Sequence, residues 1–309
     1  MPLGICLLQI NKIQNTQFYK LKILNTSLED IILSNDKRGI SDLRPHLPKE
    51  YCKNAVDLIP KPPSTIAITT GFYIINANAP ETDGPPGAIC IGNALEQIGH
   101  SVFYITDKYT VPIMENYISD KSKMLEFPIM NLTDSKSFSK DILQDKSPSL
   151  LISVERCSAS EDGIYRNMRD IDISSHTAKI DTLFELHAKS IGIGDGGNEI
   201  GLGNVSDWVK KSEQLVQFPA RTKVTELILS SISNWGAYGL IAGLSIKNGS
   251  NLLPNTKAES ELIKNMVDSG AVDGVSGETS YKVDGFNLDE YLWALTKLNQ
   301  ITNFRLNSP

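Results

Sequence analysis

The sequence has few of the residues on which soft metal sites, disulfide frameworks and membrane spans depend. Its 309 residues include four cysteines, which lie far apart, and four histidines without an HxH or HExxH pattern. A structural zinc site is therefore not expected, and the cysteines are predicted to be free thiols in a reducing compartment. No run approaches about 18 apolar residues, so the sequence predicts no membrane-spanning helix and no membrane partner.

An excess of positive charge is also lacking. The formal net charge is -6 at pH 7, with 40% hydrophobic and 21% charged residues. Binding to a nucleic-acid backbone requires clustered lysine and arginine, so nucleic acid is not predicted as a partner. The first residues, MPLGICLLQINKIQN, lack the basic region and cleavage site of a signal peptide. We therefore expect a cytoplasmic location, with the mitochondrial matrix as the alternative for a eukaryotic protein.

Two regions are predicted from the pattern of the chain. Residues 1–60 contain short helical patterns, such as NTSLEDIILSND with a cap at Thr26 or Ser27, and are interpreted as an N-terminal helical appendage. The proline-rich stretch KPPS at 61–64 marks the boundary. Residues 61–309 are then predicted to form an α/β domain.

From residue 65 onward, apolar β-branched strands alternate with helical patterns. Strands are expected at 65–74, 101–106, 149–156 and 190–194, and helices in AICIGNALEQIG, KIDTLFELHAKS, NEIGLGNVSDWVKKS, NWGAYGLIAGLSI and NLDEYLWALTKLNQI. Residues 120–141 are polar and are expected to form an irregular surface connection, whereas TKVTELILSSISN stays open between strand and helix. The alternation predicts a mostly parallel sheet with helices on both faces.

Acidic, glycine-rich loops follow three of the expected strands. The polar residues that follow the first strand are Glu81 and Asp83, those after the third are Glu155, Arg156 and Asp162, and those after the fourth are Asp195, Asn198 and Glu199. The carboxyl ends of parallel strands meet at one edge of a sheet, so these side chains are expected to converge. Gathered carboxylates repel unless a cation neutralises them, and oxygen ligands favour Mn²⁺ or Mg²⁺. The predicted metal ligands are accordingly Asp195, Glu199, Glu81 and Asp83.

Two other interpretations of the stretch GIGDGGNEIGLG stay open. Gly192, Gly194 and Gly197 match the G-x-G-x-x-G fingerprint of dinucleotide binding. Against this interpretation, Asp195 and Glu199 would place negative charge where a pyrophosphate must lie. Alternatively, the acidic residues and glycines of the three loops serve only as helix caps and turns.

Further candidates suit the recognition of a small acid. Arg156 and Arg169 could grip a carboxylate through paired N–H donors, or could balance the acidic loops. Asn234 caps the helix expected to begin in SNWGAYG, and Lys282 lies in GVSGETSYKVDG, which is interpreted as a hairpin loop. The predicted substrate-binding residues are Arg169, Asn198, Asn234 and Lys282. The predicted catalytic residues are Glu155, Asp162 and Arg156.

Four motifs resemble the C-terminal domain of the D-glutamate cyclase family. They are VERCSASEDGIYRNMRDIDI, GIGDGGNEIGLG, ISNWGAYGL and GVSGETSYKVDG, and the resemblance runs from about residue 60 to the C-terminus. It implies an α/β domain that converts D-glutamate to 5-oxo-D-proline with loss of water, and a divalent metal in an acidic cavity. At the matching positions, the residues implied are Glu155, Asp162, Asp195, Asn198 and Glu199. Glu81 and Asp83, which lie outside the four motifs, are added to this set.

Larger members of this family carry a second, upstream domain that resembles a hydro-lyase, whereas about 60 residues precede the shared region here. Three functions therefore stand side by side: a metal-dependent lyase of the D-glutamate cyclase type, a metal-dependent hydrolase of a phosphorylated small molecule, and a non-catalytic binder of metal or metabolite. The expected partners are a small-molecule acid and either a second copy of the chain or a separate chain with the upstream domain.

Overall fold

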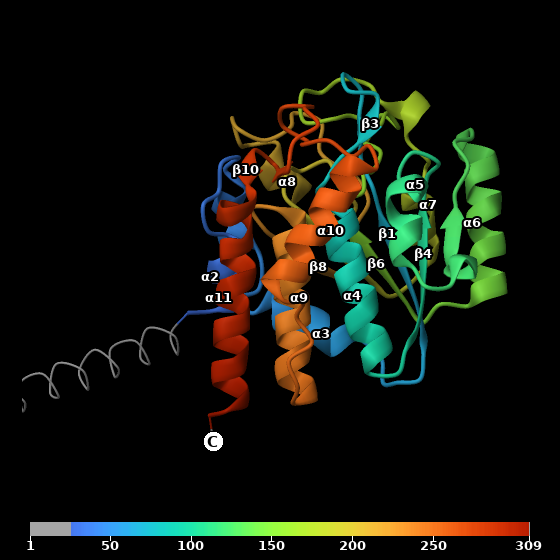
Figure 1. Cartoon of the computed structure of the whole chain (residues 1–309). Coiled ribbons are helices and arrows are strands. Elements are labelled where there is room, and N and C mark those ends of the chain that lie inside the picture. Colours follow the sequence, from blue (N-terminus) through green and yellow to red (C-terminus); the bar gives the residue numbers. More distant parts are fainter. Residues whose placement is uncertain (1–25, 309) are drawn as a thin grey trace, which may run out of the picture.

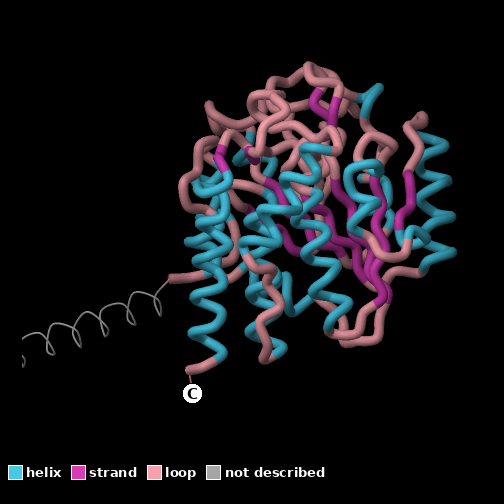
Figure 2. Tube along the Cα trace, in the orientation of Figure 1, coloured by secondary structure: helices cyan, strands magenta, loops and turns pink. Residues whose placement is uncertain are grey.

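Six short apolar strands pair in parallel to form the central sheet of the computed structural model, which describes residues 26–308 (Figures 1 and 2). In spatial order they are β5 (Met124–Glu126), β4 (Ser101–Thr106), β1 (Thr65–Thr70), β6 (Leu150–Val154), β7 (Ser190–Gly194) and β8 (Glu226–Leu229). The prediction of a mostly parallel α/β sheet is confirmed. The strand order reverses between β1 and β6, and such a reversal opens a crevice at the carboxyl ends of the strands.

Helices cover both faces of the sheet because successive strand side chains point to opposite sides. Ile66 and Ile68 of β1 join the core on one face, whereas Ala67 joins the core on the other. The first core is covered by α2 (Leu28–Ile32), α3 (Tyr51–Leu58), α4 (Pro85–Gln97), α9 (Ser233–Asn248), α10 (Thr256–Asp268) and α11 (Leu288–Leu306). The second core is covered by α6 (Leu132–Lys146) and α7 (Asp181–Leu186).

Short elements complete the loops at the carboxyl ends of the strands, which lie at the top of Figure 1. The hairpins are β2–β3 (Tyr73–Ile74 and Ala79–Pro80) and β9–β10 (Lys282–Val283 and Phe286–Asn287), and the single-turn helices are α5 (Val111–Met114) and α8 (Ser206–Val209). Short 3-10 turns lie at Ile40–His46, Glu115–Tyr117, Lys121–Lys123, Ser174–His176 and Leu202–Val205. The helix expected in NEIGLGNVSDWVKKS consists of two single turns, Leu202–Val205 and Ser206–Val209.

The described part of the N-terminal region belongs to the main core. Helix α2 begins with a capping box between Ser27 and Asp30, as its sequence pattern predicts. Tyr51 of α3 donates a hydrogen bond of 2.7 Å from its Oη to the carbonyl of Leu229 in β8. Both helices pack on α9. Residues 26–60 therefore have no hydrophobic core separate from that of residues 61–308, while residues 1–25 of the expected appendage lie outside the described residues.

The expectation of an irregular connection at 120–141 is wrong, because this stretch contains β5 and the start of helix α6. Asn131 caps the helix by accepting a hydrogen bond from the amide of Asp134. The buried residues of α6 are Ser135, Ser139 and Ile142, and the partly buried Phe138 and Leu143 also pack against the second core. Ser139 is satisfied there by the hydroxyl of Thr182, 2.7 Å away. Because serines occupy two of the buried positions, the apolar spacing at Phe138, Ile142 and Leu143 is short and is easily missed in a polar stretch.

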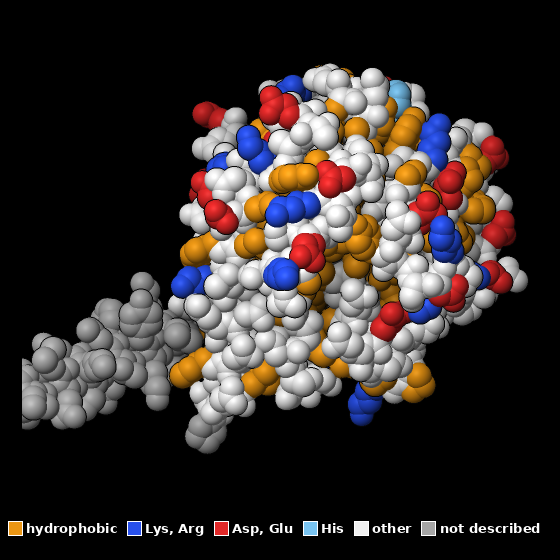
Figure 3. Space-filling view, viewed as in Figure 1, with side chains coloured by type: hydrophobic (Ala, Val, Ile, Leu, Met, Phe, Trp, Pro, Cys, Tyr) orange, Lys and Arg blue, Asp and Glu red, His pale blue; other side chains and the backbone are white. Residues whose placement is uncertain are grey.

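Strand boundaries near the crevice also differ from expectation. The first strand ends at Thr70 rather than continuing to residue 74, because Gly71 turns the chain at a φ of 104°. The stretch that periodicity left open, TKVTELILSSISN, contains β8. Among the described residues, no helix is both long and apolar enough to cross a bilayer. On the face drawn in Figure 3, acidic and basic side chains are interspersed.

A buried carboxylate joins three of the helices that cover the first core. Glu259 of α10 accepts hydrogen bonds from the hydroxyl of Tyr238 in α9 and from the thiol of Cys90 in α4, the latter at 3.2 Å. The hydroxyl of Tyr291 in α11 lies 2.5 Å from that of Tyr238. Burial raises the pKa of Glu259, and hydrogen bonds from Tyr238 and Cys90 only partly offset this rise.

We predict that Glu259 makes the stability of the protein depend on pH. The pKa of Glu259 in the folded state lies above the ordinary value of 4.5. Its contribution to the free energy of unfolding is therefore fully present below about pH 4.5 and is lost as the pH rises through the folded-state pKa. Glu259→Gln keeps an acceptor oxygen but cannot ionise. Relative to wild type, the free energy of unfolding of this variant should increase between pH 5 and pH 8, by about 1.4 kcal/mol for each unit by which the pKa of Glu259 is raised.

Denaturant titrations at several pH values measure this effect. The control is Glu261→Gln, which removes an exposed carboxylate from the same helix. Its pH profile should run parallel to that of wild type. A parallel profile for Glu259→Gln as well would contradict the prediction.

Candidate active site

Carboxylates from three neighbouring strands and one hairpin meet in the crevice. One triad consists of Asp83, Asp195 and Asp284, and the second of Glu155, Asp195 and Glu199. Within each triad the ligand oxygens lie within 4.8 Å of one another. The predicted convergence of the loops after β1, β6 and β7 is therefore confirmed. Asp284, in the turn between β9 and β10, was not predicted.

Glu155 is held in an unusual backbone conformation at the end of β6. Its φ is 47°, in the left-handed region that costs a residue with a side chain about 1–3 kcal/mol. Gly84 lies directly against it, and a Cβ added to Gly84 would come within 2.7 Å of the Cβ of Glu155. The carboxylate accepts a 2.6 Å hydrogen bond from the hydroxyl of Ser233. The local backbone is thus arranged to fix the direction of this side chain.

The glycine-rich loop after β7 is folded around its own carboxylate. Glu199 accepts hydrogen bonds from the amides of Asp195 (3.1 Å), Gly196 (2.6 Å) and Gly197 (2.8 Å). In the dinucleotide-binding interpretation, free amides of such a loop bind a pyrophosphate. Here Glu199 takes that place, so the loop is built to present carboxylates instead of binding an anion.

Asp83 and Asn234 tie the loop after β1 to the start of α9. Asp83 accepts hydrogen bonds of 2.8 Å from the amides of Ser233 and Asn234, which caps a helix that has no side-chain cap of its own. The side chain of Asn234 accepts from the amides of Gly84 and Gly87. Burial and the charge of Asp284 raise the pKa of Asp83 to about 8. Asn234, a predicted substrate-binding residue, is occupied by these backbone contacts.

Arg38 reaches the crevice from the N-terminal region and was not predicted. Its guanidinium donates a hydrogen bond to Oδ1 of Asp195 and lies 2.8 Å from Oδ2 of Asp284. Burial works to lower the pKa of Arg38, but the charges of Asp195 and Asp284 outweigh burial and raise it. Arg38 therefore stays cationic between two acidic loops.

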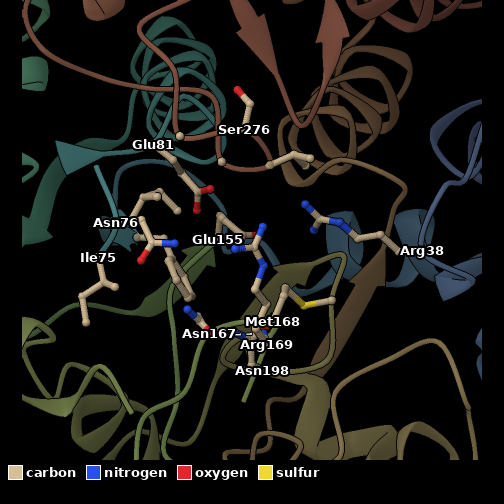
Figure 4. Close-up of a pocket in the computed structure, with 15 residues that line it drawn as sticks. Arg38, Ile75, Asn76, Glu81, Glu155, Asn167, Met168, Arg169, Asn198 and Ser276 are labelled. Carbon is tan, nitrogen blue, oxygen red and sulfur yellow. Dashed lines mark hydrogen bonds between the residues drawn. The ribbon is translucent and has the colours of Figure 1, made fainter. Parts of the chain in front are cut away.

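A cavity of about 230 Å³ opens beside the triads (Figure 4). Its volume is smaller than the roughly 300–1,000 Å³ of drug-sized sites, which suits a small metabolite. Figure 4 shows Arg38 and Glu81 approaching Glu155 from different sides. The polar side chains of the lining belong to Arg38, Asn76, Glu81, Glu155, Asn167, Arg169, Asn198 and Ser276. Among residues 26–308, no carboxylate forms an ion pair with Arg169.

The electrostatics of the crevice suit a hard cation. Burial raises the pKa values of Glu81, Glu155 and Asp195 well above the ordinary range, and neighbouring carboxylates raise those of Glu81 and Glu155 further. Oδ2 of Asp195 and Oδ1 of Asn198 are buried without a hydrogen-bond partner among the described residues. An unpartnered carboxylate oxygen such as Oδ2 of Asp195 is a donor that Mn²⁺ and Mg²⁺ prefer, so the carboxylates of the crevice fit such an ion.

Three further predicted site residues belong, like Asn234, neither to the cavity lining nor to the carboxylate triads. Asp162 is exposed and ion-paired with Arg166, and the hydrogen bond from that guanidinium lowers the pKa of Asp162 to about 2. Arg156 is buried against Asp107 (2.6 Å) and the carbonyls of Gly71 and Ala178 (both 2.8 Å). Lys282 belongs to β9, where its carbonyl accepts a hydrogen bond from the hydroxyl of Thr82. Ion pairs thus hold the side chains of Asp162 and Arg156, whereas Lys282 contacts the loop after β1 through its backbone.

A family comparison covers this whole arrangement. The family model described as "D-glutamate cyclase-like, C-terminal" matches residues 28–299. The chain belongs to this family. The match includes residues 28–60, so Arg38 lies inside the family region although the resemblance seen in the sequence began near residue 60.

Similarity to individual proteins is more distant. Human mitochondrial D-glutamate cyclase is 27% identical over 264 residues, which cover 72% of this chain and 43% of the human protein. The chain thus spans less than half the length of that relative. Among solved structures, an exopolyphosphatase-related protein from Bacteroides fragilis aligns with a TM-score of 0.42 and 9% identity, over 84% of this chain and 61% of its own. An actinorhodin polyketide ketoreductase variant with NADPH aligns with a TM-score of 0.25 and 12% identity, over 61% and 66%.

We predict that Arg156 stabilises the fold and takes no part in chemistry. Arg156→Met leaves Asp107 buried without its cation, which typically costs about 3–5 kcal/mol. Arg156→Met combined with Asp107→Asn should recover part of this loss. Chemical denaturation measures both variants.

Arg44→Met serves as the control for this prediction. Arg44 pairs with Asp30 at the surface, where an ion pair contributes about 0–1 kcal/mol. An Arg156→Met variant as stable as wild type would refute the structural role.

Proposed function

We propose that this chain is a divalent-metal-dependent lyase of the D-glutamate cyclase type, which converts D-glutamate to 5-oxo-D-proline and water. Membership in the family supports the reaction class. The observation that carries the proposal is the content of one small cavity, which presents an unpaired guanidinium, Arg169, together with buried carboxylates of two loops. A small amino acid with two carboxylates and one ammonium group complements this lining.

Recognition of the substrate follows from these charges. Arg169 is the arginine of the cavity that has no carboxylate partner, so we assign it to the α-carboxylate, which a guanidinium can bind through two parallel N–H donors. Arg38 is already engaged by Asp195 and Asp284. The free Oδ1 of Asn198 is an acceptor for the ammonium group, while its Nδ2 stays fixed on the carbonyl of Arg166 at 2.8 Å.

The chemistry requires proton transfer within the cavity. Ring closure forms a bond between the α-nitrogen and the γ-carbon and breaks one C–O bond of the γ-carboxylate. In total, two protons leave the ammonium group and two reach the departing oxygen, which becomes water. Glu81 lines the cavity and lies outside both triads of the described residues, so we assign it to carrying these protons.

The remaining carboxylates fit a cation-binding role. Glu155, Asp195 and Glu199 would hold one Mn²⁺ or Mg²⁺, since Oδ2 of Asp195 is buried and has no other partner among the described residues. When bound, such an ion supplies positive charge that polarises the γ-carboxylate, which is otherwise a poor electrophile. Amides of the loop after β7 hold Glu199 in place, and the hydroxyl of Ser233 holds Glu155.

We predict that the purified chain forms 5-oxo-D-proline from D-glutamate in the presence of Mn²⁺. Glu81→Gln should lower turnover by about 10²–10⁴-fold, because positioned acid–base groups contribute that much to rate. Glu161→Gln, the same change at an exposed position, should leave turnover unchanged. A stereospecific assay for 5-oxoproline makes the measurement.

Other outcomes of this assay would distinguish the remaining functions. No product from either enantiomer of glutamate, with metal present, would refute the lyase proposal. Phosphate release from a phosphorylated small molecule under the same conditions would then favour the hydrolase. Metal binding without either activity would favour a binding protein.

We also predict that Mn²⁺ stabilises the folded chain. An ion that binds only the folded state adds roughly 2.7 kcal/mol at a hundredfold excess over its dissociation constant. Asp195→Asn should weaken this effect, because Asp195 contributes to both triads. Thermal melts with and without Mn²⁺, after treatment with a chelator, make the comparison. Equal shifts for wild type and Asp195→Asn would place the ion elsewhere.

A further inference from the structure

Two carboxylate triads share a single residue, which is the geometry of two adjacent cation sites. Asp195 belongs to the triad with Asp83 and Asp284 and to the triad with Glu155 and Glu199. All five side chains are buried. A carboxylate can use its two oxygens toward two different cations. The crevice therefore has ligands for two positive charges side by side.

Arg38 already supplies positive charge to one of these triads. It donates to Oδ1 of Asp195 and lies 2.8 Å from Oδ2 of Asp284, whereas Oδ2 of Asp195 has no partner among the described residues. One oxygen of the shared aspartate thus faces a built-in cation and the other is free. The third member of this triad, Asp83, is held by the amides of Ser233 and Asn234.

We propose that Arg38 takes the place of a second metal ion, so that the crevice binds one divalent cation instead of two. The inference rests on the cation of the proposed function and adds a role for the chain's own guanidinium. Arg38 holds the triad of Asp83, Asp195 and Asp284. The single ion then belongs to the triad of Glu155, Asp195 and Glu199.

The segment around Arg38 is built to hold the guanidinium in place. Asp36 accepts hydrogen bonds from the amides of Arg38 (2.8 Å), Gly39 (3.0 Å) and Ser41 (2.8 Å), which closes a tight turn. The neighbouring Lys37 has other partners, since its Nζ lies 3.3 Å from the centre of the Phe286 ring and donates a 3.4 Å hydrogen bond to the carbonyl of Gly285. Of two adjacent cations, the turn therefore directs only Arg38 to the triad.

The number of bound Mn²⁺ ions tests the proposal without any measurement of activity. Chelator-treated full-length protein is titrated with Mn²⁺ alone, and free Mn²⁺ is measured by electron paramagnetic resonance. Wild type should bind one ion, and Arg38→Met should bind two. Arg38→Lys, which keeps the positive charge, should bind one.

Two further variants locate the second ion. Lys37→Met removes a neighbouring positive charge from the same turn and should still bind one ion. Arg38→Met combined with Asp284→Asn should return from two ions to one, because Asp284 belongs only to the triad that Arg38 holds. Melting curves establish that each variant is folded. If Arg38→Met is unstable, Arg38→Lys and Lys37→Met still test the proposal. Binding of two ions by either of these variants would overturn it.

Failure of this inference is distinguishable from failure of the proposed reaction. Two ions in wild type, or the same number in wild type and Arg38→Met, would overturn the role of Arg38 even if D-glutamate were turned over. A change from one ion to two without turnover of D-glutamate would support the role of Arg38 and refute only the reaction.

Discussion

Carboxylates buried at the carboxyl ends of β1, β6 and β7 repel one another, and the groups around them must offset this repulsion. Four of these carboxylates have different partners: amides of α9 for Asp83, amides of its own loop for Glu199, a hydroxyl for Glu155, and a guanidinium for Asp195. The donors are amides, a hydroxyl and a guanidinium, and none is a neighbouring carboxyl group. Several carboxylates are therefore buried close together, which is unfavourable in a hydrophobic core without such donors.

The order of the strands explains why this constraint falls where it does. Parallel strands end on the same side, and the reversal of order between β1 and β6 leaves the crevice that no crossover covers. Helix α9 starts at this crevice and then packs against α2, α3, α4 and α11. The segment that receives the cap from Asp83 is therefore also central to the first hydrophobic core. Because α9 belongs to both the crevice and the first core, the packing of the helices on this face of the sheet also fixes the position of the acidic loops.

Local patterns in the sequence were sufficient for most of the sheet and for part of the site. The strand expected at 101–106 has the same bounds in the structure, and Glu155 and Asp195 were found because each directly follows a strand. Helix α6 was missed because Phe138, Ile142 and Leu143 form only a short apolar pattern within a polar stretch. Arg38 was missed because it meets Asp195 across 157 residues of sequence, and no local pattern marks such a contact. Asp162 and Arg156 were predicted from their place after the third expected strand, yet each has a nearby partner of opposite charge.

The turn at Asp36–Ser41 has a consequence for any attempt to shorten this chain. The proline-rich stretch at 61–64 looks like a natural place to cut, since it precedes the first strand of the sheet. A cut there would remove α2, α3 and the only described cation in ion-pair contact with Asp195 and Asp284, so it would uncover a core surface and unbalance the crevice at the same time. A shortened chain that keeps the crevice balanced should therefore retain α2 together with its cap at Ser27.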